Sequence, residues 1–438
     1  MRPAAFPWYF LHAVPFLTLE DPNAKIKGSR DPLGVQPIWA AFGRHVVTNL
    51  TTVSTSVRGF TTLLLGRYFA ADLVDRGMAT REEALDIFLR MEQICAYARY
   101  VGHGDVDDIR GIERVKRFVD EQDGRVAIQA DRRGMILSDQ KTYGLWGLYS
   151  VSARRSGLIP EGSLDVSPDA REFVERHYVR QLNGAARPLH QLLAKGGILN
   201  TRGKDAVFAA MANIMSGELL PEEVEFYAHF LRDGLEVEDV DPERQARFRE
   251  LLETVADLNE PTGRAEILNL SRRARGHDMG LATRLERIAH LEAFLAPSDA
   301  LFQHLLTQGN QEPDTVADGI ASHWGGRVPN LDRDAFQDLL DEIRSIVGPA
   351  IAQQMDRCHA ALHDGDYEEA MLALLDWNQI VMNDRGAAPW LRYGEQGRLD
   401  VRYRGNEQLL PDENELNELW RNTYFIDALK SVTKQLEQ

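Results

Sequence analysis

Two histidines spaced four residues apart are the pair in this sequence best suited to binding a metal ion. His359 and His363 lie in a pattern that predicts a helix, where residues i and i+4 share a face, and Asp364 follows directly. Imidazole nitrogens and a carboxylate oxygen are common ligands of zinc. Position 360 is alanine, however, where a metalloprotease of the His-Glu-x-x-His type carries its glutamate base. The spacing therefore allows a metal site, but we favour a polar helix end, where histidine suits the C-terminal dipole.

The sequence contains two His-Asp dipeptides, His277-Asp278 and His363-Asp364. Metal-dependent phosphohydrolases and nucleases of all-α type use such pairs, provided that further histidines and aspartates converge on the metal. Both dipeptides fall at expected helix ends or turns, where aspartate is common for conformational reasons. This type of enzyme is the alternative function that we keep.

A stretch without acidic residues, 32–71, stands out because the rest of the chain is strongly acidic. Its polar positions include Arg44, Arg58 and Arg67, and the loop before it contains Lys25, Lys27 and Arg30. Arginine beside serine and threonine hydroxyls is suitable for binding phosphate. Alternatively, the arginines pair with carboxylates from elsewhere in the chain, and the serines, threonines and glycines allow close helix packing. We favour this second interpretation.

Residues 107–160 are the other basic part of the N-terminal third. Aromatic residues between positions 143 and 149 precede Arg154 and Arg155. This order is compatible with a helix-turn-helix-like surface for nucleic acid. A helix that buries Trp146 and Tyr149 in the core, with its arginines at the solvent end, explains the same pattern.

Two further segments have a strong charge bias. Residues 264–287 are rich in arginine, including Arg272, Arg273 and Arg275, and are a second candidate for contact with a polyanion or an acidic protein surface. Residues 218–243 contain ten acids and one base, Arg232, which predicts an acidic face exposed to solvent or to a partner.

The elements that must position these residues are mostly α-helices. Apolar residues recur at steps of three and four through most of the chain. The hydroxyl-rich residues 48–56 and Gly59 interrupt the acid-free stretch, which predicts two helices rather than one. We expect one long helix over 331–363 and a helical hairpin that turns at 364–366. Small β-structures are expected within 388–410, where residues alternate with period two, and within 124–135.

The expected organisation is three consecutive domains: an N-terminal helical domain (1–160), a helical middle domain (161–310), and a C-terminal domain (311–438) with the hairpin, the β-structure and a terminal helix. The glycine-rich residues 309–330 suggest the second boundary.

Composition limits the class of protein. The chain has 438 residues and a formal net charge of −17, which argues against a surface coated for non-specific binding of nucleic acid or membranes. Cys95 and Cys358 are the only cysteines, and each lies in a helical pattern, as in proteins of a reducing cytoplasm. No apolar window is long enough to span a bilayer. We expect a cytoplasmic protein that has no membrane segment and no cofactor.

No catalytic or nucleotide-binding motif is present in the sequence. An acidic, helical chain of this kind resembles the accessory or adaptor subunits of bacterial multi-gene systems, including those for anti-phage defence and DNA handling. This resemblance is one of general character and rests on no motif. The expected function is a non-enzymatic adaptor or scaffold that binds protein partners, with DNA or RNA as an additional ligand through the basic residues.

Overall fold

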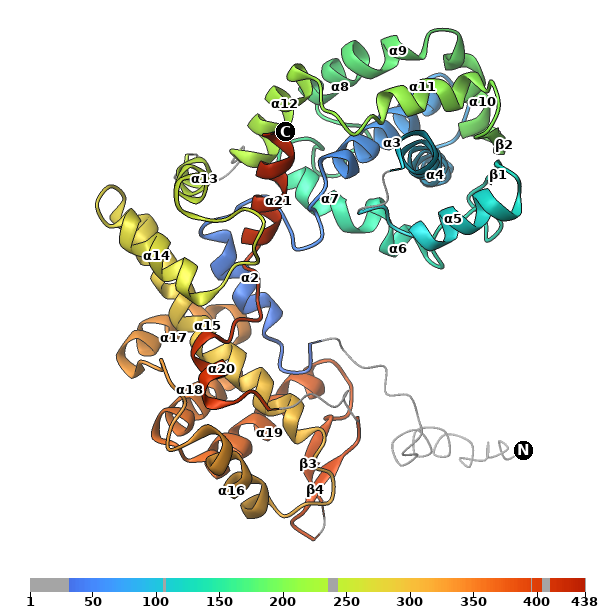
Figure 1. The fold of residues 1–438 in the computed structure, drawn as a ribbon. Coiled ribbons are helices and arrows are strands. Elements are labelled where there is room, and N and C mark those ends of the chain that lie inside the picture. Colours follow the sequence, from blue (N-terminus) through green and yellow to red (C-terminus); the bar gives the residue numbers. More distant parts are fainter. Residues whose placement is uncertain (1–30, 105–107, 235–242, 395, 404–409, 438) are drawn as a thin grey trace, which may run out of the picture. The chain divides into compact units, whose positions relative to one another are not determined.

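The computed structural model describes residues 31–104, 108–234, 243–394, 396–403 and 410–437. Lys25, Lys27 and Arg30 lie outside these ranges. The chain folds into two compact units, each made of segments that are distant in sequence (Figure 1). Unit 1 contains residues 1–42 and 262–422, and unit 2 contains residues 43–261 and 423–438. The boundaries expected at 160 and 310 fall within unit 2 and unit 1, respectively.

The fold is mostly helical, as the sequence predicts, and two small antiparallel sheets confirm both expected β-structures. Strand β1 (Arg125–Ile128) pairs with β2 (Gly197–Asn200), so its partner comes from far along the chain. Strand β3 (Leu391–Tyr393) pairs with β4 (Leu399–Val401) in a local hairpin.

The acid-free stretch forms two helices, as predicted: α2 (Gln36–Arg44) and α3 (Val57–Asp75). Helix α3 begins at the N-cap Ser56, whose side chain accepts a hydrogen bond from the amide of Gly59. Nearly every residue of α3 is buried. This helix therefore lies in the core of unit 2, and its buried Arg58 and Arg67 need polar partners there.

Helices α3 and α4 (Ala84–His103) lie between two groups of helices (Figure 1). One group contains α8 to α11 and the other α5 to α7, and members of both groups pack against the central pair. The remaining helical elements of unit 2 are α5 (Ile112–Glu121), α6 (Gln140–Tyr143), α7 (Leu145–Arg155), α8 (Pro168–Val174), η2 (Glu175–Val179), α9 (Arg180–Leu182), η3 (Asn183–Ala185), α10 (Ala186–Lys195), α11 (Ala206–Ile214), α12 (Pro221–Tyr227), η4 (Ala228–Arg232), α13 (Arg244–Val255) and α21 (Ile426–Leu436).

Within 107–160, where a helix-turn-helix-like surface was one of two interpretations, α5 and α7 are separated by strand β1 and by α6. Helix α6 is a single turn of four residues. The segment therefore lacks the pair of consecutive, fully formed helices that the motif normally uses.

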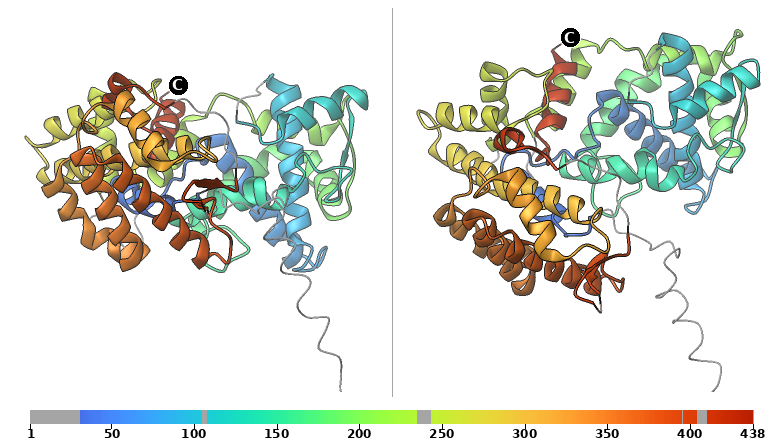
Figure 2. Two further views of the ribbon diagram at one scale, coloured as in Figure 1. Left: turned by 90° about the horizontal axis from the view of Figure 1, so that it is seen from below. Right: turned by 60° about the horizontal axis from the view of Figure 1, so that its bottom comes forward.

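In unit 1, helices α17 (Arg333–Val347), α18 (Pro349–Asp364) and α19 (Tyr367–Asp384) pack side by side (Figure 2). The single helix expected over 331–363 is wrong, because Gly348 adopts φ +82° and Pro349 starts a new helix. The turn expected at 364–366 is confirmed, and Asp366 caps α19 by accepting a hydrogen bond from the amide of Glu369.

The other helices of unit 1 are α14 (Arg264–Ala274), α15 (Met279–Leu305), α16 (Pro313–Trp324) and α20 (Glu413–Glu418). Helix α16 occupies the middle of the glycine-rich residues 309–330, where we expected a domain boundary. Its Trp324 is fully buried and donates a hydrogen bond to the carbonyl of Pro411 at 2.8 Å. In the described part of the chain, no helix has the length and apolar character needed to cross a membrane.

Candidate functional site

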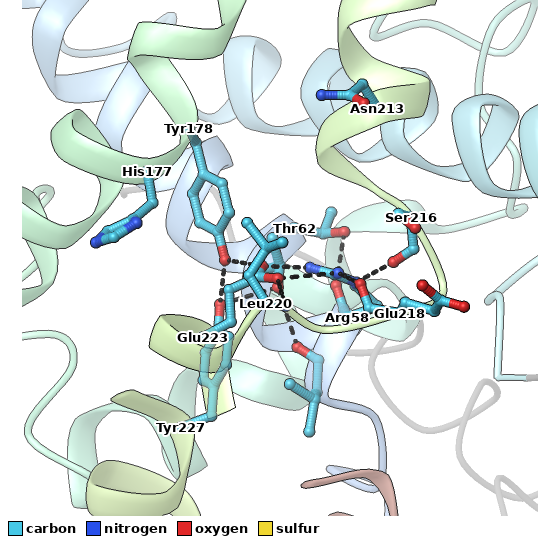
Figure 3. A network of polar contacts seen from close by, with 12 residues as sticks. Arg58, Thr62, His177, Tyr178, Asn213, Ser216, Glu218, Leu220, Glu223 and Tyr227 are labelled. Carbon is cyan, nitrogen blue, oxygen red and sulfur yellow. Dashed lines mark hydrogen bonds and ion pairs between the residues drawn. The ribbon is translucent and has the colours of Figure 1, made fainter. Parts of the chain in front are cut away.

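Arg58, in the first turn of α3, is the centre of a buried polar network in unit 2 (Figure 3). Its Nη1 lies 2.6 Å from Oε1 of Glu223 and its Nη2 lies 3.2 Å from Oε2, so the ion pair is bidentate. The two side chains are only 6% and 2% exposed, respectively. The remaining donors reach the carbonyls of Ser216 (2.6 Å) and Glu218 (2.9 Å). The guanidinium thus points into the fold, whereas a polyanion contact would need it at the surface.

Two tyrosines extend this network toward the neighbouring helices (Figure 3). The hydroxyl of Tyr178 donates to Oε1 of Glu223 at 2.6 Å and lies 3.3 Å from the hydroxyl of Tyr227. The hydroxyl of Tyr227 lies 2.9 Å from Oγ1 of Thr61. The side chains of Thr61, Tyr178, Glu223 and Tyr227 are all buried. The network therefore joins α3, η2 and α12 through polar groups that are one another's hydrogen-bond partners.

Burial also fixes the protonation of the two phenols. It raises the pKa of Tyr178 well above its ordinary value, with the neighbouring Tyr227 and the Glu223 carboxylate adding to the shift. Burial and the same carboxylate raise the pKa of Tyr227. Both hydroxyls therefore stay protonated at neutral pH and act as hydrogen-bond donors, which is a structural role.

Both helices that meet at this network contain a π-helical segment. Tyr178 lies within η2, and Tyr227 directly precedes η4. Next to them, Phe173 of α8 stacks on Phe226 of α12, with ring centroids 3.9 Å apart and planes 6° from parallel. π-Helical turns are rare and occur frequently at functional sites. This pair of helices is accordingly our candidate site.

The side of α12 and η4 away from the network is accessible to solvent. An open depression of about 500 Å³ lies along it, with lining positions that recur at steps of three and four: Pro221, Val224, Glu225, Ala228, His229, Arg232 and Asp233. At one end, Leu220 is 47% exposed, and Glu222 is also exposed. At the other end, Asp233 pairs with Arg249 at 3.1 Å. The surface therefore combines a small apolar floor with carboxylates near the start of α12.

The inward-facing residues of this site were not predicted from the sequence. Glu223 belongs to the acidic run 218–243 and was expected on an exposed face. It turns inward because its Oε2 accepts a hydrogen bond from the amide of Leu220 at 2.8 Å, which caps α12, and because Arg58 lies behind it. A glutamate three residues after the N-cap is a recognisable capping signal. No comparable local signal marks Tyr178 or Tyr227.

The other predicted arginines of unit 2 gather in pairs around α7. The guanidinium of Arg44 lies over the ring of Phe425 at 3.9 Å and donates to the carbonyl of Leu50 at 2.5 Å. Burial first, and then the nearby charge of Arg155, lower the pKa of Arg44 to about 9. Likewise, burial first and then Arg154 lower the pKa of Arg67 to about 10.

The predicted basic residues of 264–287 belong to unit 1. Arg272 and Arg273 are exposed at the end of α14, and Arg275 forms an ion pair with Glu286 that also involves Ser271. These arginines are therefore distant in sequence from the arginines around α7 and belong to the other unit.

The predicted metal ligands His359 and His363 lie in different environments, one buried and one partly exposed. His359 is buried, stacks on Phe336 with ring centroids 4.1 Å apart, and has its Nδ1 3.3 Å from Nη1 of Arg333. Burial, followed by that arginine, lowers the pKa of His359 to about 3, so its ring is neutral. His363 is partly exposed, with Nδ1 2.7 Å from Oδ1 of Asp364. Among the described residues, no three His, Cys, Asp or Glu side chains are grouped so that they could hold a metal ion.

A small cavity beside α4 contains a carboxyl group with an unusual pKa. The cavity measures about 20 Å³, which is room for one water molecule. Oε1 of Glu92 accepts a hydrogen bond from the amide of Leu145, and Oε2 accepts one from Nε2 of Gln140, both at 2.7 Å. Burial raises the pKa of Glu92 to about 7. The ion pair between Arg99 and Asp108 (2.7 Å) borders the same cavity. A carboxyl group of this kind exchanges protons near neutral pH, but the space beside it is too small for a substrate.

Comparison of the chain with family models, with curated proteins and with solved structures finds no match.

Proposed function

We propose that the chain is an adaptor that binds a basic segment of a partner protein along the exposed side of α12 and η4. The observation that carries this proposal is the open depression along that side, which is lined by one stripe of a helical element. A protein helix or extended segment can lie along such a stripe, whereas a small molecule would be poorly enclosed by it.

The chemistry of the stripe suits a partner segment that is both basic and apolar. Val224, Ala228 and the exposed Leu220 offer apolar contact. Glu222 and Glu225 are exposed on the same helix and carry negative charge. Acidic surfaces of this kind increase the rate of association with basic partners and select among them.

The buried network supplies a rigid support for this surface. Glu223 and Tyr227 lie on the inward side of α12 and are fixed by Arg58, Tyr178 and Thr61. A binding surface that is ordered before association loses less conformational entropy when the partner binds.

Copurification from the native host tests this function. We would compare the tagged wild-type chain with a Val224→Lys/Glu225→Lys variant and quantify the copurifying proteins by mass spectrometry. The expected result is at least one partner that is reduced about tenfold or more in the variant, because the change reverses the charge and disrupts the apolar floor. The partner's interacting segment should also be rich in lysine or arginine.

Glu82→Lys provides the matched control, since Glu82 is an exposed glutamate of the same unit away from α12. Its partner profile should equal that of the wild type. Equal recovery of partners by the Val224/Glu225 variant would show that this side of α12 is not the binding surface. If no protein copurifies with the wild type at low or physiological salt, the adaptor function itself is wrong.

A further inference from the structure

The surface around α7 differs in charge from the acidic side of α12. Arg154 and Arg155 occupy the last turn of α7, and Arg67 and Arg44 approach it from the neighbouring segments. The only carboxylate that the structure places near Arg154 among the described residues is the exposed Glu161, at 3.7 Å. In a chain with 67 acids and 50 bases, four neighbouring arginines form a local basic region.

Arg67 is the most unusual of these four. Its side chain is 3% exposed and its guanidinium lies over the Trp146 ring at 3.7 Å. Its hydrogen bonds go to Oγ of Ser150 at 3.2 Å and the carbonyl of Ser163 at 3.4 Å, while its Nε has no hydrogen-bond partner among the described residues. These partners are neutral, so the positive charge of Arg67 is not cancelled locally and adds to the potential at the α7 surface.

The exposed side of α6 and α7 provides contacts next to this charge. Lys141 and Tyr143 (47% exposed) are exposed on α6, and Gly147, Val151 (45% exposed) and Arg155 follow one another at steps of four on α7. A Cβ on Gly147 would lie 2.2 Å from the carbonyl oxygen of Thr142. The glycine therefore allows α6 to pack tightly on the first turn of α7.

Local structure explains only part of this arrangement. Arginines in the last turn of a helix interact favourably with the helix dipole, and Nη1 of Arg155 lies 3.4 Å from the carbonyl of Thr48. The dipole does not account for the exposed Lys141 and Tyr143 on α6. An external polyanion with planar groups accounts for this pair.

We propose that the exposed side of α6 and α7 binds a single strand of nucleic acid, with Lys141 and Arg155 contacting phosphates and Tyr143 stacking on a base. Aromatic side chains within a basic surface are characteristic of single-strand binding. Lys141 lies on α6, before α7, and Arg155 lies at the end of α7, which spans roughly 16 Å at 1.5 Å per residue, so the two residues can reach different phosphates. Duplex recognition fits less well, because a recognition helix reads bases with its N-terminal residues, whereas the arginines here lie at the C-terminal end.

Fluorescence anisotropy tests this proposal with labelled DNA and RNA strands of about 20 nucleotides at about 50 mM salt, a condition that favours phosphate contacts. Lys141→Ala/Arg155→Ala should weaken binding about tenfold and reduce the salt dependence by about two counterions, because two phosphate contacts are lost. Tyr143→Ala should weaken binding about tenfold while leaving the salt dependence unchanged, because it removes stacking alone.

Arg81→Ala/Lys204→Ala is the matched control, since both residues are exposed, lie in unit 2, and are remote in sequence from α6 and α7. It removes the same charge and should bind the strand as the wild type does. The far-ultraviolet circular dichroism of each variant should equal that of the wild type.

Four results would overturn the proposal. The first is no binding of either strand by the wild type. The second is equal loss of affinity in the control and in the Lys141/Arg155 variant, which would indicate a general charge effect. The third is equally tight binding of polyglutamate or of inorganic phosphate at matched ionic strength, which would indicate an acidic protein or a single anion as the ligand. Tighter binding of the duplex than of the strand would also contradict it.

Discussion

At the scale of single residues, Glu223 shows how this fold holds a charge in its interior. Its carboxylate accepts hydrogen bonds from both Nη atoms of Arg58, from the hydroxyl of Tyr178 and from the amide of Leu220. Transfer of an ion pair from water costs several kcal/mol per ion, and it is offset only where further hydrogen bonds complete the geometry. Here those bonds come from three different segments, so the pair also specifies how the segments meet.

Arg58→Met should destabilise unit 2 by about 3–5 kcal/mol, because it leaves the Glu223 carboxylate buried without its cation. The double variant Arg58→Met/Glu223→Gln should recover part of this loss, since the unpaired charge is removed. Urea denaturation followed by circular dichroism measures both. Arg76→Met is the control: Arg76 is 56% exposed at the C-terminal end of α3, and its ion pair with Asp72 (2.7 Å) should contribute at most about 1 kcal/mol. A double variant less stable than Arg58→Met would contradict this account.

Glu92 makes stability depend on pH near neutrality. Its pKa is about 7 in the folded protein and about 4.5 ordinarily, so the folded state holds the proton more tightly than the unfolded state does. The stabilisation is therefore complete below pH 4.5 and is lost as the pH rises through 7. The difference in unfolding free energy between wild type and Glu92→Gln should fall by about 1.4 kcal/mol per pH unit in this window and level off above it. Denaturation curves at several pH values measure it, and a constant difference would rule out a raised pKa.

At the scale of elements, α3 can lie in the core because small residues let its neighbours approach closely. A Cβ on Gly59 would lie 2.7 Å from the ring of Tyr149 on α7, and a Cβ on Gly66 would lie 2.6 Å from the ring of Phe88 on α4. Glycine within a helix costs about 1 kcal/mol in propensity relative to alanine. Close packing against two aromatic rings offsets that cost.

Gly59→Ala should consequently destabilise the protein by about 1–3 kcal/mol, although alanine is the better helix former, because the Tyr149 ring would have to move. Gly217→Ala is the matched control, since a Cβ there meets nothing within 4 Å. Thermal unfolding followed by circular dichroism compares the two. If Gly59→Ala proved as stable as the wild type, the contact between α3 and α7 would be looser than the structure shows.

At the scale of the whole molecule, each unit is completed by segments from distant parts of the chain. Unit 2 ends with α21, which follows the whole of unit 1 in sequence. Nε2 of Gln435 donates to the carbonyl of Thr55 at 2.7 Å, and its Oε1 accepts a hydrogen bond from the amide of Val57 at 3.0 Å. The buried Lys430 donates to the carbonyl of Glu260 at 3.0 Å. The C-terminal helix therefore secures the start of α3 and the end of the 43–261 segment.

Removal of residues 423–438 should loosen η4, α13 and the start of α3, since these parts pack on α21 or form hydrogen bonds with it. Hydrogen exchange followed by mass spectrometry should show faster exchange there, while α17 to α19 of unit 1 serve as the internal control and keep their protection. Uniformly faster exchange across both units would instead indicate that they fold as one.

The sequence by itself determined the helical class, the division of the acid-free stretch into two helices, the turn at Asp366, the local hairpin of β3 and β4 and the position of β1, but not that of its partner β2. Hydrophobic periodicity and turn chemistry act over a few residues, so they can be recognised without knowledge of the fold. The same local rules failed at Gly348, where a glycine with positive φ ends a helix that the apolar pattern would continue.

Only the tertiary structure decided which groups meet. Arg58 pairs with a carboxylate 165 residues away, and Glu223 turns inward from a run of acids that looks exposed throughout. The approach of Arg154 to Arg67, and of Arg155 to Arg44, likewise depends on how α7 packs against α3 and its neighbours. Such contacts follow from the packing of several helices at once, because a side chain's partner is set by which faces are brought together and not by its neighbours in sequence.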